Sequence, residues 1–433
     1  MLSNNLSQFM SKSVTSLIGV LFTSSHIKNP GKGKELKAPD AFSPVLRFAV
    51  CSDVHLNGEK DQEAAVRFGQ LFDDMYSAFD KLDALVIAGD FTGGGAEKEY
   101  EMFNLIVSEH IRPETKLLPI LGNHEFINYR DYDATIGYDV YKKYISEQVD
   151  THFVVNGFHF IGVSYDNDGK KFAGKLAWLK EQLDEAVKED PSKPVFVYQH
   201  PHPFATVYGS INWGTYEVRK VLQKYPQVVN FSGHSHYAPS DPRSVWQGSF
   251  TAVGCGSLAA FMGNLNYIEG DKDAPGKSGG FRLVEVDKDG CIRMRLYDSE
   301  NRTFFENCEY YFTNINKTTK RNYTWHRQKS LDTKPLFPNN AQIFAEKASD
   351  GSVLLKFPNA KGHYDAENYK ITVSASGKKV FEKTVISDYV RAVSDGMSVN
   401  VGSIEKGEYA VKIVPYSPYA KKGSTIKGTI EIS

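Results

Sequence analysis

The chain has 433 residues, of which 41% are hydrophobic and 24% charged, so it is long enough for a large folded core and a second, smaller domain. Its 51 basic and 52 acidic side chains nearly cancel, which leaves no strong field to hold a polyanion and argues against nucleic acid as a partner. The four cysteines lack the paired spacing of a zinc site. No apolar run is long enough to span a bilayer as a helix.

The first predicted unit, residues 1–44, is an amphipathic helix followed by a connector. Apolar residues recur at spacings of three and four over the first 21 positions, which is typical of such a helix. Residues Met10 to Ser25 also half meet the description of a secretory signal. We expect an uncleaved helix that packs on the body. Attachment to a membrane surface is the alternative, and the single Lys12 on the polar side argues against it.

Residues 45–331 alternate short apolar runs with longer helical patterns, which predicts an α/β domain. Apolar spacing predicts helices around residues 68–79 and 176–187. The runs expected to form strands of the main sheet system are Leu46–Cys51, Ala84–Ala88, Leu117–Leu121, Val195–Tyr198, Val228–Ser232, Gly280–Val286 and Ile292–Tyr297.

Residues 332–433 are expected to form a small all-β sandwich. A stretch with Pro and Asn, Asp332 to Asn340, has the composition of a linker, and only strand patterns follow it. The late strands resemble those of a fibronectin type III module. Such a domain would dock on the α/β domain, bind glycan, cell wall or protein, or act as a spacer, and the sequence does not choose among these roles.

Polar residues follow five of the predicted strands at the point where each strand ends. They are Asp53 and His55, Asp90, Asn123 and His124, His200, and His234 and His236. Each one alone is explained by a turn, a helix cap or a satisfied polar side chain. Together they lie where the carboxyl ends of strands gather ligands, and buried groups of this kind need compensation. Two divalent cations would compensate all of them at once.

In this order the segments resemble the calcineurin-like metallophosphoesterase family. The resemblance covers roughly residues 45 to 310 and rests on these motifs: Asp53-Val54-His55, Gly89-Asp90, Gly122-Asn123-His124-Glu125, His200 and Gly233-His234-Ser235-His236. It implies a four-layer αββα sandwich. It also implies a metal-dependent phosphoesterase, in which a hydroxide that bridges two divalent metal ions attacks phosphorus.

The resemblance also assigns roles to the residues. Asp53, His55 and His236 would bind the first metal ion. Asn123, His200 and His234 would bind the second, and Asp90 would bridge the two. His124 would be the general acid that protonates the leaving group, with a phosphate contact as its alternative role. The mixed histidine and carboxylate ligands suit Mn, Fe, Zn or Co.

Two positions leave questions open. Many family members have Asp or Asn at the position of Gly93, where that side chain orients the histidine equivalent to His124, so the partner of His124 must come from elsewhere or be absent. Purple acid phosphatases have Tyr at this position, and Gly93 therefore argues against a purple Fe(III) site. His202 competes with His200 for one ligand position, and His200 is preferred because it follows its strand directly.

The expected substrate is a small phosphate ester, and monoesters and diesters both stay open. Phe204, Tyr208 and Trp213 lie on a loop near His200, where they would pack in the core or form a wall for a base or aryl leaving group. The alternative function is a non-catalytic metal-binding scaffold for protein or glycan. The lack of a convincing signal favours the cytoplasm, and the fibronectin-like tail favours the cell surface or secretion. The sequence gives no oligomeric state.

Overall fold

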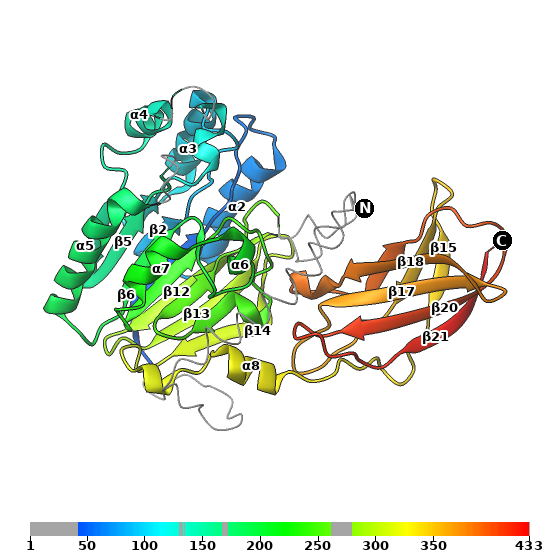
Figure 1. Ribbon diagram of the computed structural model, residues 1–433. Helices are drawn as coiled ribbons and strands as arrows, with labels where there is room; N and C mark the ends of the chain where they lie inside the picture. Colours follow the sequence, from blue (N-terminus) through cyan, green and yellow to red (C-terminus); the bar gives the residue numbers. More distant parts are fainter. Residues whose placement is uncertain (1–41, 130–132, 134, 167–171, 261–278, 433) are drawn as a thin grey trace.

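The computed structural model describes residues 42–129, 133, 135–166, 172–260 and 279–432 (Figure 1). Over these ranges the chain forms a mixed α/β part built on two six-stranded sheets, followed by smaller sheets that lie beside it. The helix expected near the N-terminus lies outside the described residues. In the part that is described, no helix is both long enough and apolar enough to cross a membrane.

The first large sheet has the strand order β14-β13-β12-β1-β2-β3. Its strands in chain order are β1 (Pro44–Cys51), β2 (Ala84–Ile87), β3 (Lys116–Pro119), β12 (Gly280–Asp287), β13 (Ile292–Asp298) and β14 (Thr303–Phe312). β1, β2 and β3 are parallel neighbours, whereas β12 pairs with β1 antiparallel. The carboxyl ends of the three parallel strands therefore share one edge, and the segments that carry Asp53, Asp90 and Asn123 leave from it.

The second large sheet has the order β10-β11-β9-β6-β5-β4. Its strands are β4 (Thr151–Val155), β5 (Phe158–Val163), β6 (Val195–Gln199), β9 (Val228–Ser232), β10 (Val245–Gln247) and β11 (Thr251–Gly254). β5, β6, β9 and β11 run parallel. His200 follows β6 directly, and His234 follows β9 after Gly233. These histidines of the second sheet therefore also lie at the carboxyl ends of parallel strands.

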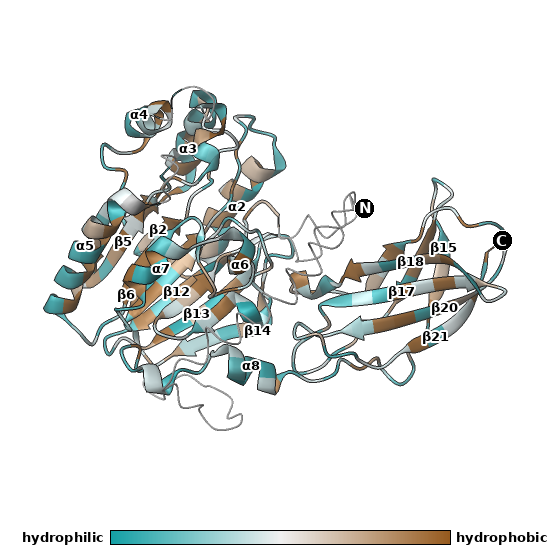
Figure 2. Cartoon of the chain, viewed as in Figure 1, coloured by the Kyte–Doolittle hydropathy of each residue, from teal (hydrophilic) through white to brown (hydrophobic). Residues whose placement is uncertain are grey.

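Alternate residues of the strands face two different cores, and this alternation explains the layers. Phe48 and Val50 of β1 point into an apolar core between the two sheets, whereas Ala49 and Cys51 point outward to helices. The helices on the first sheet are α2 (Glu63–Ala78), α3 (Glu97–His110) and α4 (Thr135–Tyr144). Those on the second are α5 (Leu176–Glu189) and α7 (Tyr216–Leu222). The predicted four-layer αββα sandwich is confirmed, and Figure 2 shows apolar residues concentrated in its strands.

Short elements complete this part of the chain. They are β7 (His202–Pro203), α6 (Ser210–Trp213), β8 (Gly214–Thr215) and α8 (Trp325–Leu331), with 3-10 turns at His124–Tyr129, Ala173–Lys175, Pro242–Ser244 and Thr318–Lys320. A further 3-10 turn, Asp388–Val390, lies between strands of the C-terminal sheets. All four cysteines are free and buried, which agrees with the absence of a disulfide pattern in the sequence.

The C-terminal residues form two antiparallel sheets, as expected for an all-β region. One contains β15 (Phe344–Lys347), β16 (Val353–Phe357) and β19 (Met397–Asn400). The other contains β17 (Asn368–Ala375), β18 (Lys378–Ile386), β20 (Gly407–Tyr416) and β21 (Ile426–Ile432). Their inward residues build a separate apolar core. The domain limits at residues 45 and 332 and the fibronectin-like character stay predictions.

The C-terminal sheets contact the α/β part through the segment after β18. Val390 is 1% exposed and belongs to the same apolar cluster as the core between the two large sheets. Next to it, the backbone N–H of Ala392 donates to Asp298 Oδ2 at 2.7 Å. The two parts therefore share buried surface in addition to their covalent connection.

Replacement of Phe48 by Ala tests the core between the sheets. The Phe48 ring is fully buried and lies 5.0 Å from Phe160, 4.8 Å from Phe196 and 5.9 Å from Phe231, between ring centroids. We expect Phe48→Ala to lower the free energy of unfolding by about 3–5 kcal/mol because it leaves a cavity. Urea denaturation measures the loss. Val66→Ala, at a residue 57% exposed, is the control and should change stability by less than about 0.5 kcal/mol.

Candidate metal centre

The two sheets bring the predicted ligands together at one edge of the sandwich. Three groups of side chains have ligand atoms within 4.8 Å of one another, and each group is large enough to hold a metal ion: Asp53, His55 and His236; His55, Asp90 and His124; and Asp90, His200 and His234. The groups overlap at His55 and Asp90. Segments that follow four different strands, β1, β2, β6 and β9, supply the two outer groups, so the cluster exists only in the folded chain.

The first group is centred on the buried carboxylate of Asp53. Its Oδ1 lies 3.0 Å from His236 Nε2 and 3.8 Å from His55 Nε2, and the two imidazole nitrogens are 3.0 Å apart. The backbone N–H of His234 also donates to this carboxylate, at 3.0 Å to Oδ2. Two ring nitrogens and one carboxylate oxygen thus face a common point, which is a suitable donor set for a divalent transition metal.

The second group is centred on Asp90. His200 Nε2 lies 2.8 Å from Asp90 Oδ2, and His234 Nδ1 lies 3.2 Å from His200 Nε2. The other nitrogen of His200, Nδ1, donates to the carbonyl oxygen of Ala88 at 2.8 Å. Histidines that bind metals commonly donate their second ring N–H to a carbonyl in this way, because it fixes the ring and its tautomer.

Asn123 supplies a separate test of the site. Its side-chain oxygen Oδ1 is buried and has no hydrogen-bond partner. A buried polar atom without a partner loses its hydration and gains nothing in return, so such atoms are rare in folded proteins. A cation at the predicted second position would satisfy this oxygen. The residues present therefore fit a metal centre.

His124 is oriented by the main chain. Its Nδ1 lies 2.8 Å from the carbonyl oxygen of Gly93, and because a carbonyl only accepts, Nδ1 carries the hydrogen. Its backbone N–H donates to Asp90 Oδ1 at 2.8 Å. Nε2 is then left facing the cluster, 3.9 Å from Asp90 Oδ2, on a side chain that is 31% exposed. The partner sought in the sequence is found at position 93 itself, as a carbonyl oxygen.

The backbone at the site has an uncommon conformation. Five predicted ligands have positive φ, namely Asp53 at 54°, His55 at 55°, Asp90 at 52°, His234 at 73° and His236 at 54°. Such values are unfavourable for residues with a side chain and gather at functional sites. The first three of them are held by hydrogen bonds between the loops after β1 and β2, including Asp53 N–H to Gly89 O and His55 N–H to Asp90 O, both 3.1 Å.

Glycines before the ligands permit this close approach. A Cβ on Gly122 would lie 2.2 Å from Asp90 Oδ1, and one on Gly233 would lie 2.2 Å from Asp53 Oδ2. Both distances are far below van der Waals contact. The glycines of the Gly-Asn-His and Gly-His segments are therefore required because the two carboxylates occupy the space that a side chain would need.

The charges at the site favour cations. Burial opposes ionisation of Asp53, yet His236 and His200 hold the pKa of its carboxyl well below the usual range. Burial is outweighed at Asp90 as well, where His200 lowers the pKa to about 2. At His200, burial is overcome by Asp90 and Asp53, which raise the pKa to about 9. For His234, burial and then the charge of His200 lower the pKa to about 4. The two anionic carboxylates thus favour positive charge on His200, whereas His234 stays neutral.

Glu125 is a residue of the site to which the sequence alone gave no role. Its buried carboxylate accepts hydrogen bonds from the backbone N–H groups of Asp90, Thr92 and Gly122 and from the Thr92 hydroxyl. Burial, followed by the charge of Asp90, raises the pKa of Glu125 to about 7, while these donors favour its ionised form. In the sequence, Glu125 stands out only as an acid directly after Asn123 and His124. Glu125 ties together the loops after β2 and β3.

The choice between His200 and His202 is informed by hydrogen bonding. His202 Nδ1 lies 2.8 Å from Ser232 Oγ, and Nε2 lies 2.8 Å from Ser235 Oγ. Burial, followed by the charge of His234, lowers the pKa of His202 to about 3, so the ring is neutral. Both nitrogens of His202 are occupied, whereas Nε2 of His200 faces the cluster. This geometry favours His200 as the ligand.

The aromatic residues near His200 differ in their exposure and in their contacts. Trp213 is 40% exposed and lies edge-on to His234, with ring centroids 5.4 Å apart. Tyr208 is buried at 7% exposure, and its hydroxyl donates to Glu367. Phe204 lies edge-on to Tyr216 at 6.3 Å. Among these, Trp213 is the side chain whose contact reaches a predicted ligand.

The comparison with protein families decides the membership of this part of the chain. Residues 46–238 match the model of the calcineurin-like phosphoesterases, and this range includes all seven predicted ligands and His124. Residues 46–238 belong to the calcineurin-like phosphoesterase family. The resemblance that the sequence motifs indicated is thereby confirmed for this range.

Individual relatives of this phosphoesterase region are distant. The UPF0046 protein K07C11.7 of Caenorhabditis elegans is 27% identical over 213 residues, which cover 46% of this chain and 66% of that protein. A purple acid phosphatase from yellow lupin (Lupinus luteus) seeds has 13% identity and a TM-score of 0.45, covering 62% of this chain and 55% of its own. A 5'-nucleotidase precursor from Thermus thermophilus has 16% identity and a TM-score of 0.34, and the match covers 58% of this chain and 54% of that protein. At such values neither structure bears on substrate or activity.

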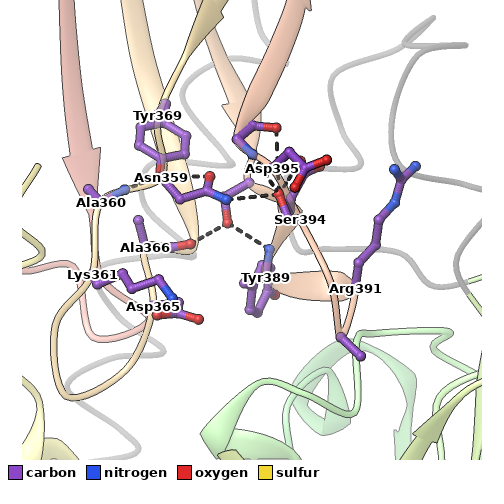
Figure 3. A pocket seen from close by; sticks show the side chains of 14 residues that line it. Asn359, Ala360, Lys361, Asp365, Ala366, Tyr369, Tyr389, Arg391, Ser394 and Asp395 are labelled. Carbon is purple, nitrogen blue, oxygen red and sulfur yellow. Dashed lines mark hydrogen bonds between the residues drawn. The ribbon is translucent and has the colours of Figure 1, made fainter. Parts of the chain in front are cut away.

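Two hollows lie away from the phosphoesterase centre. One, of about 220 Å³, opens among loops of the C-terminal sheets (Figure 3), where Asn359 donates to Ser394 Oγ and Ser394 donates to Asp388, both at 2.8 Å. The other, of about 590 Å³, lies beside β14 and α8 and is lined by Tyr310 and Tyr364 among others. Within the described residues, neither hollow is lined by a predicted ligand. Contact with glycan or protein through the C-terminal residues stays a prediction.

Replacement of Glu125 by Gln tests its role in joining the two loops. Glutamine is the same size, but its NH₂ group would face two of the groups that now donate hydrogen bonds to the Glu125 carboxylate. We expect a loss of about 2 kcal/mol or more in the free energy of unfolding, because buried donors would be left without acceptors. Chemical denaturation measures it. The exposed Glu114 provides the matched control, since Glu114→Gln should be neutral; equal stability of both variants would refute this role.

Proposed function

We propose that this protein is a metal-dependent hydrolase of phosphate esters with two divalent cations at the edge of its sandwich. Asp53, His55 and His236 would bind the first cation. Asn123, His200 and His234 would bind the second, and Asp90 would bind both. The observation that carries the proposal is the set of three donor groups that overlap at His55 and Asp90, with the unpartnered oxygen of Asn123 beside them. The family of residues 46–238 supports the same chemistry.

The chemistry that such a cation pair supplies when bound is a lowered pKa for a water molecule and withdrawal of charge from the phosphoryl oxygens. The protein's own contribution is to hold the donors in place before substrate arrives. Asp53 is fixed by the backbone N–H of His234, and Asp90 by the backbone N–H of His124. The imidazole and amide donors add no negative charge to the site, and further negative charge there would repel a phosphate.

His124 is the proposed general acid. Its Nδ1–H is held by the carbonyl of Gly93, so proton exchange with a substrate would take place at Nε2, the atom that faces the cluster. Its partial exposure leaves room for the leaving oxygen of a substrate to approach. A proton given at Nε2 would prevent the departing alkoxide from leaving as an anion.

The substrate is proposed only as a class. A small phosphate ester suits the nearly neutral net charge of the chain, 51 basic against 52 acidic residues, and nucleic acid is not expected. Whether the ester is a monoester or a diester depends on the space beside the phosphate. A panel of both kinds of ester, assayed with added Mn²⁺ and Zn²⁺, addresses this question directly.

The alternative is a non-catalytic metal-binding scaffold. Within the described residues, each of the seven ligand positions implied by the family has a suitable donor, and a scaffold has no need of a histidine placed as His124 is. The two functions differ in turnover. A scaffold would bind metal without hydrolysing any ester of the panel.

Replacement of Asp90 and His124 tests catalysis. We expect Asp90→Asn to abolish most turnover of an aryl phosphate because one oxygen donor and a negative charge are lost. His124→Ala should reduce kcat by about 10²–10⁴ because a general acid is removed. Steady-state assays measure both, with circular dichroism as a check on folding. Asp289→Asn and His326→Ala, at exposed positions, are the matched controls. Wild-type rates in both site variants would contradict the proposal.

Removal and return of metal tests the centre itself. Protein treated with a chelator and then saturated with Mn²⁺ or Zn²⁺ should hold two equivalents, measured by elemental analysis after dialysis. Its thermal midpoint should rise on saturation, since a ligand at 100 times its Kd stabilises the folded state by about 2.7 kcal/mol. Asp90→Asn should show a smaller rise. A stoichiometry below two at saturation would favour the scaffold.

A further inference from the structure

The segment between β7 and α7 carries an aromatic side chain to the metal centre. Trp213, the last residue of α6, lies edge-on to His234 with ring centroids 5.4 Å apart and an interplanar angle of 82°. Although it touches a predicted ligand, 40% of its surface is exposed. A large apolar ring left open to solvent beside a catalytic centre is placed to receive part of a substrate.

The position of Trp213 depends on the residues just before α6. The N–H groups of Asn212 and Trp213 donate to the carbonyl of Gly209, at 3.1 and 3.0 Å. Gly209 has a φ of 85°, and a Cβ there would lie 2.7 Å from the ring of Tyr237 and 2.9 Å from Ser235. The turn into α6 is thus pressed against the segment that carries His234 and His236. A shift of this turn would move Trp213.

Tyr208, the residue before Gly209, is anchored by the C-terminal sheets. Its hydroxyl donates to Glu367 Oε1 at 2.7 Å, and its backbone N–H donates to the carbonyl of Arg243 at 2.9 Å. The guanidinium of Arg243 lies 3.9 Å from the centre of the Tyr208 ring. Three kinds of contact therefore hold this residue, and one of them comes from 159 residues further along the chain.

Arg243 joins both parts of the chain to this anchor. Its Nε donates to Asp241 Oδ1 at 2.8 Å, and its Nη2 donates to Asp241 Oδ2 and to Glu367 Oε1. Although burial opposes its charge, Asp241 and Glu367 hold the pKa of Arg243 well above the usual range. Removal of one partner from a buried network of this kind leaves a charge without compensation.

Glu367 itself is fixed by its own sheet. It lies directly before β17, its N–H donates to the carbonyl of Tyr416 at 2.8 Å, and its carbonyl accepts from the N–H of Ser387 at 2.9 Å. The side chain is 13% exposed. Because the sheet holds its backbone on both sides, Glu367 provides a fixed point for the loop and does not move with it.

We propose that Trp213 forms one wall of the leaving-group subsite and that Glu367 is the positioning residue that holds it there through Tyr208 and Arg243. This proposal rests on the proposed phosphoesterase function and adds a substrate class, esters whose leaving group is a planar aromatic ring. It gives the C-terminal sheets a role in substrate selection. A flat ring gains more from contact with an indole face than a small alkyl group does.

Kinetics of aryl and alkyl esters test the proposal. The substrates are phenyl phosphate and ethyl phosphate, together with the methyl phenyl and methyl ethyl diesters of phosphate. For each substrate, the KM and kcat of a variant are compared with those of the wild type. Trp213→Ala should raise KM about fivefold to tenfold for phenyl esters and less than twofold for ethyl esters, with kcat within twofold. Glu367→Ala should have the same selective effect. The double variant should be no worse than Trp213→Ala, since Glu367 acts through Trp213.

Rescue by a conservative substitution separates positioning from a general structural role. Tyr208 and Arg243 both donate to the same atom, Oε1 of Glu367, so Glu367→Gln keeps an acceptor there and should restore KM to within twofold of wild type. Glu382→Ala is the matched control, because Glu382 pairs with Lys379 and Lys370 inside the C-terminal sheet. Equal losses on phenyl and ethyl esters, or additive effects in the double variant, would overturn the proposal.

Fluorescence reads the position of Trp213 without turnover. The emission of Trp213 is obtained as the difference between each protein and its Trp213→Phe version. Glu367→Ala should increase acrylamide quenching of this emission, whereas Glu367→Gln and Glu382→Ala should not. Unchanged quenching in Glu367→Ala would overturn the positioning role. Absence of turnover in the wild type with every ester would instead refute the proposed function, and the two failures are therefore distinct.

Discussion

The arrangement of this site depends on two carboxylates, Asp53 and Asp90, that are buried at 0% and 1% exposure and face the same group of histidines. Anions inside a protein are costly unless positive charge and hydrogen bonds surround them. The surrounding features all serve that requirement. Backbones with positive φ turn the carboxylates inward, glycines leave space beside them, and ring nitrogens converge on their oxygens. The same histidines and carboxylates also form groups that could hold a metal ion, which would supply positive charge beside the carboxylates.

Much of this arrangement could be predicted because the strands are buried. A buried strand has a fixed register, so the residue after its last apolar position must emerge at the carboxyl edge of the sheet. The prediction for Val228–Ser232 matches β9, and Leu46–Cys51 falls inside β1. Strands with weak patterns were not predicted. β21, for example, has apolar side chains at only three of its 7 positions, Ile426, Ile430 and Ile432, so its sequence carries little apolar signal.

The parts of the site that escaped prediction share a physical reason. The carbonyl of Gly93 orients His124, and a carbonyl is present at every residue, so no residue type marks it. Glutamate is most often found on protein surfaces, so its residue type does not mark Glu125 as buried. Glu125 accepts several hydrogen bonds only because the loops after β2 and β3 meet around it. Contacts that arise from the meeting of separate segments have no local pattern, whereas ligands at strand ends do.

The same distinction separates the metal centre from the surface beside it. The predicted ligands are placed by strand ends, so their positions follow from short segments of sequence. The loop with Trp213 has no such support and is held from several distant parts of the chain. Arg219 donates to the carbonyl of Phe204 at 2.6 Å, Trp325 of α8 donates to the carbonyl of Thr206 at 2.9 Å, and Tyr208 is bound by Glu367. Substitutions in the C-terminal sheets can therefore alter the surface that meets a leaving group while the ligand positions stay unchanged.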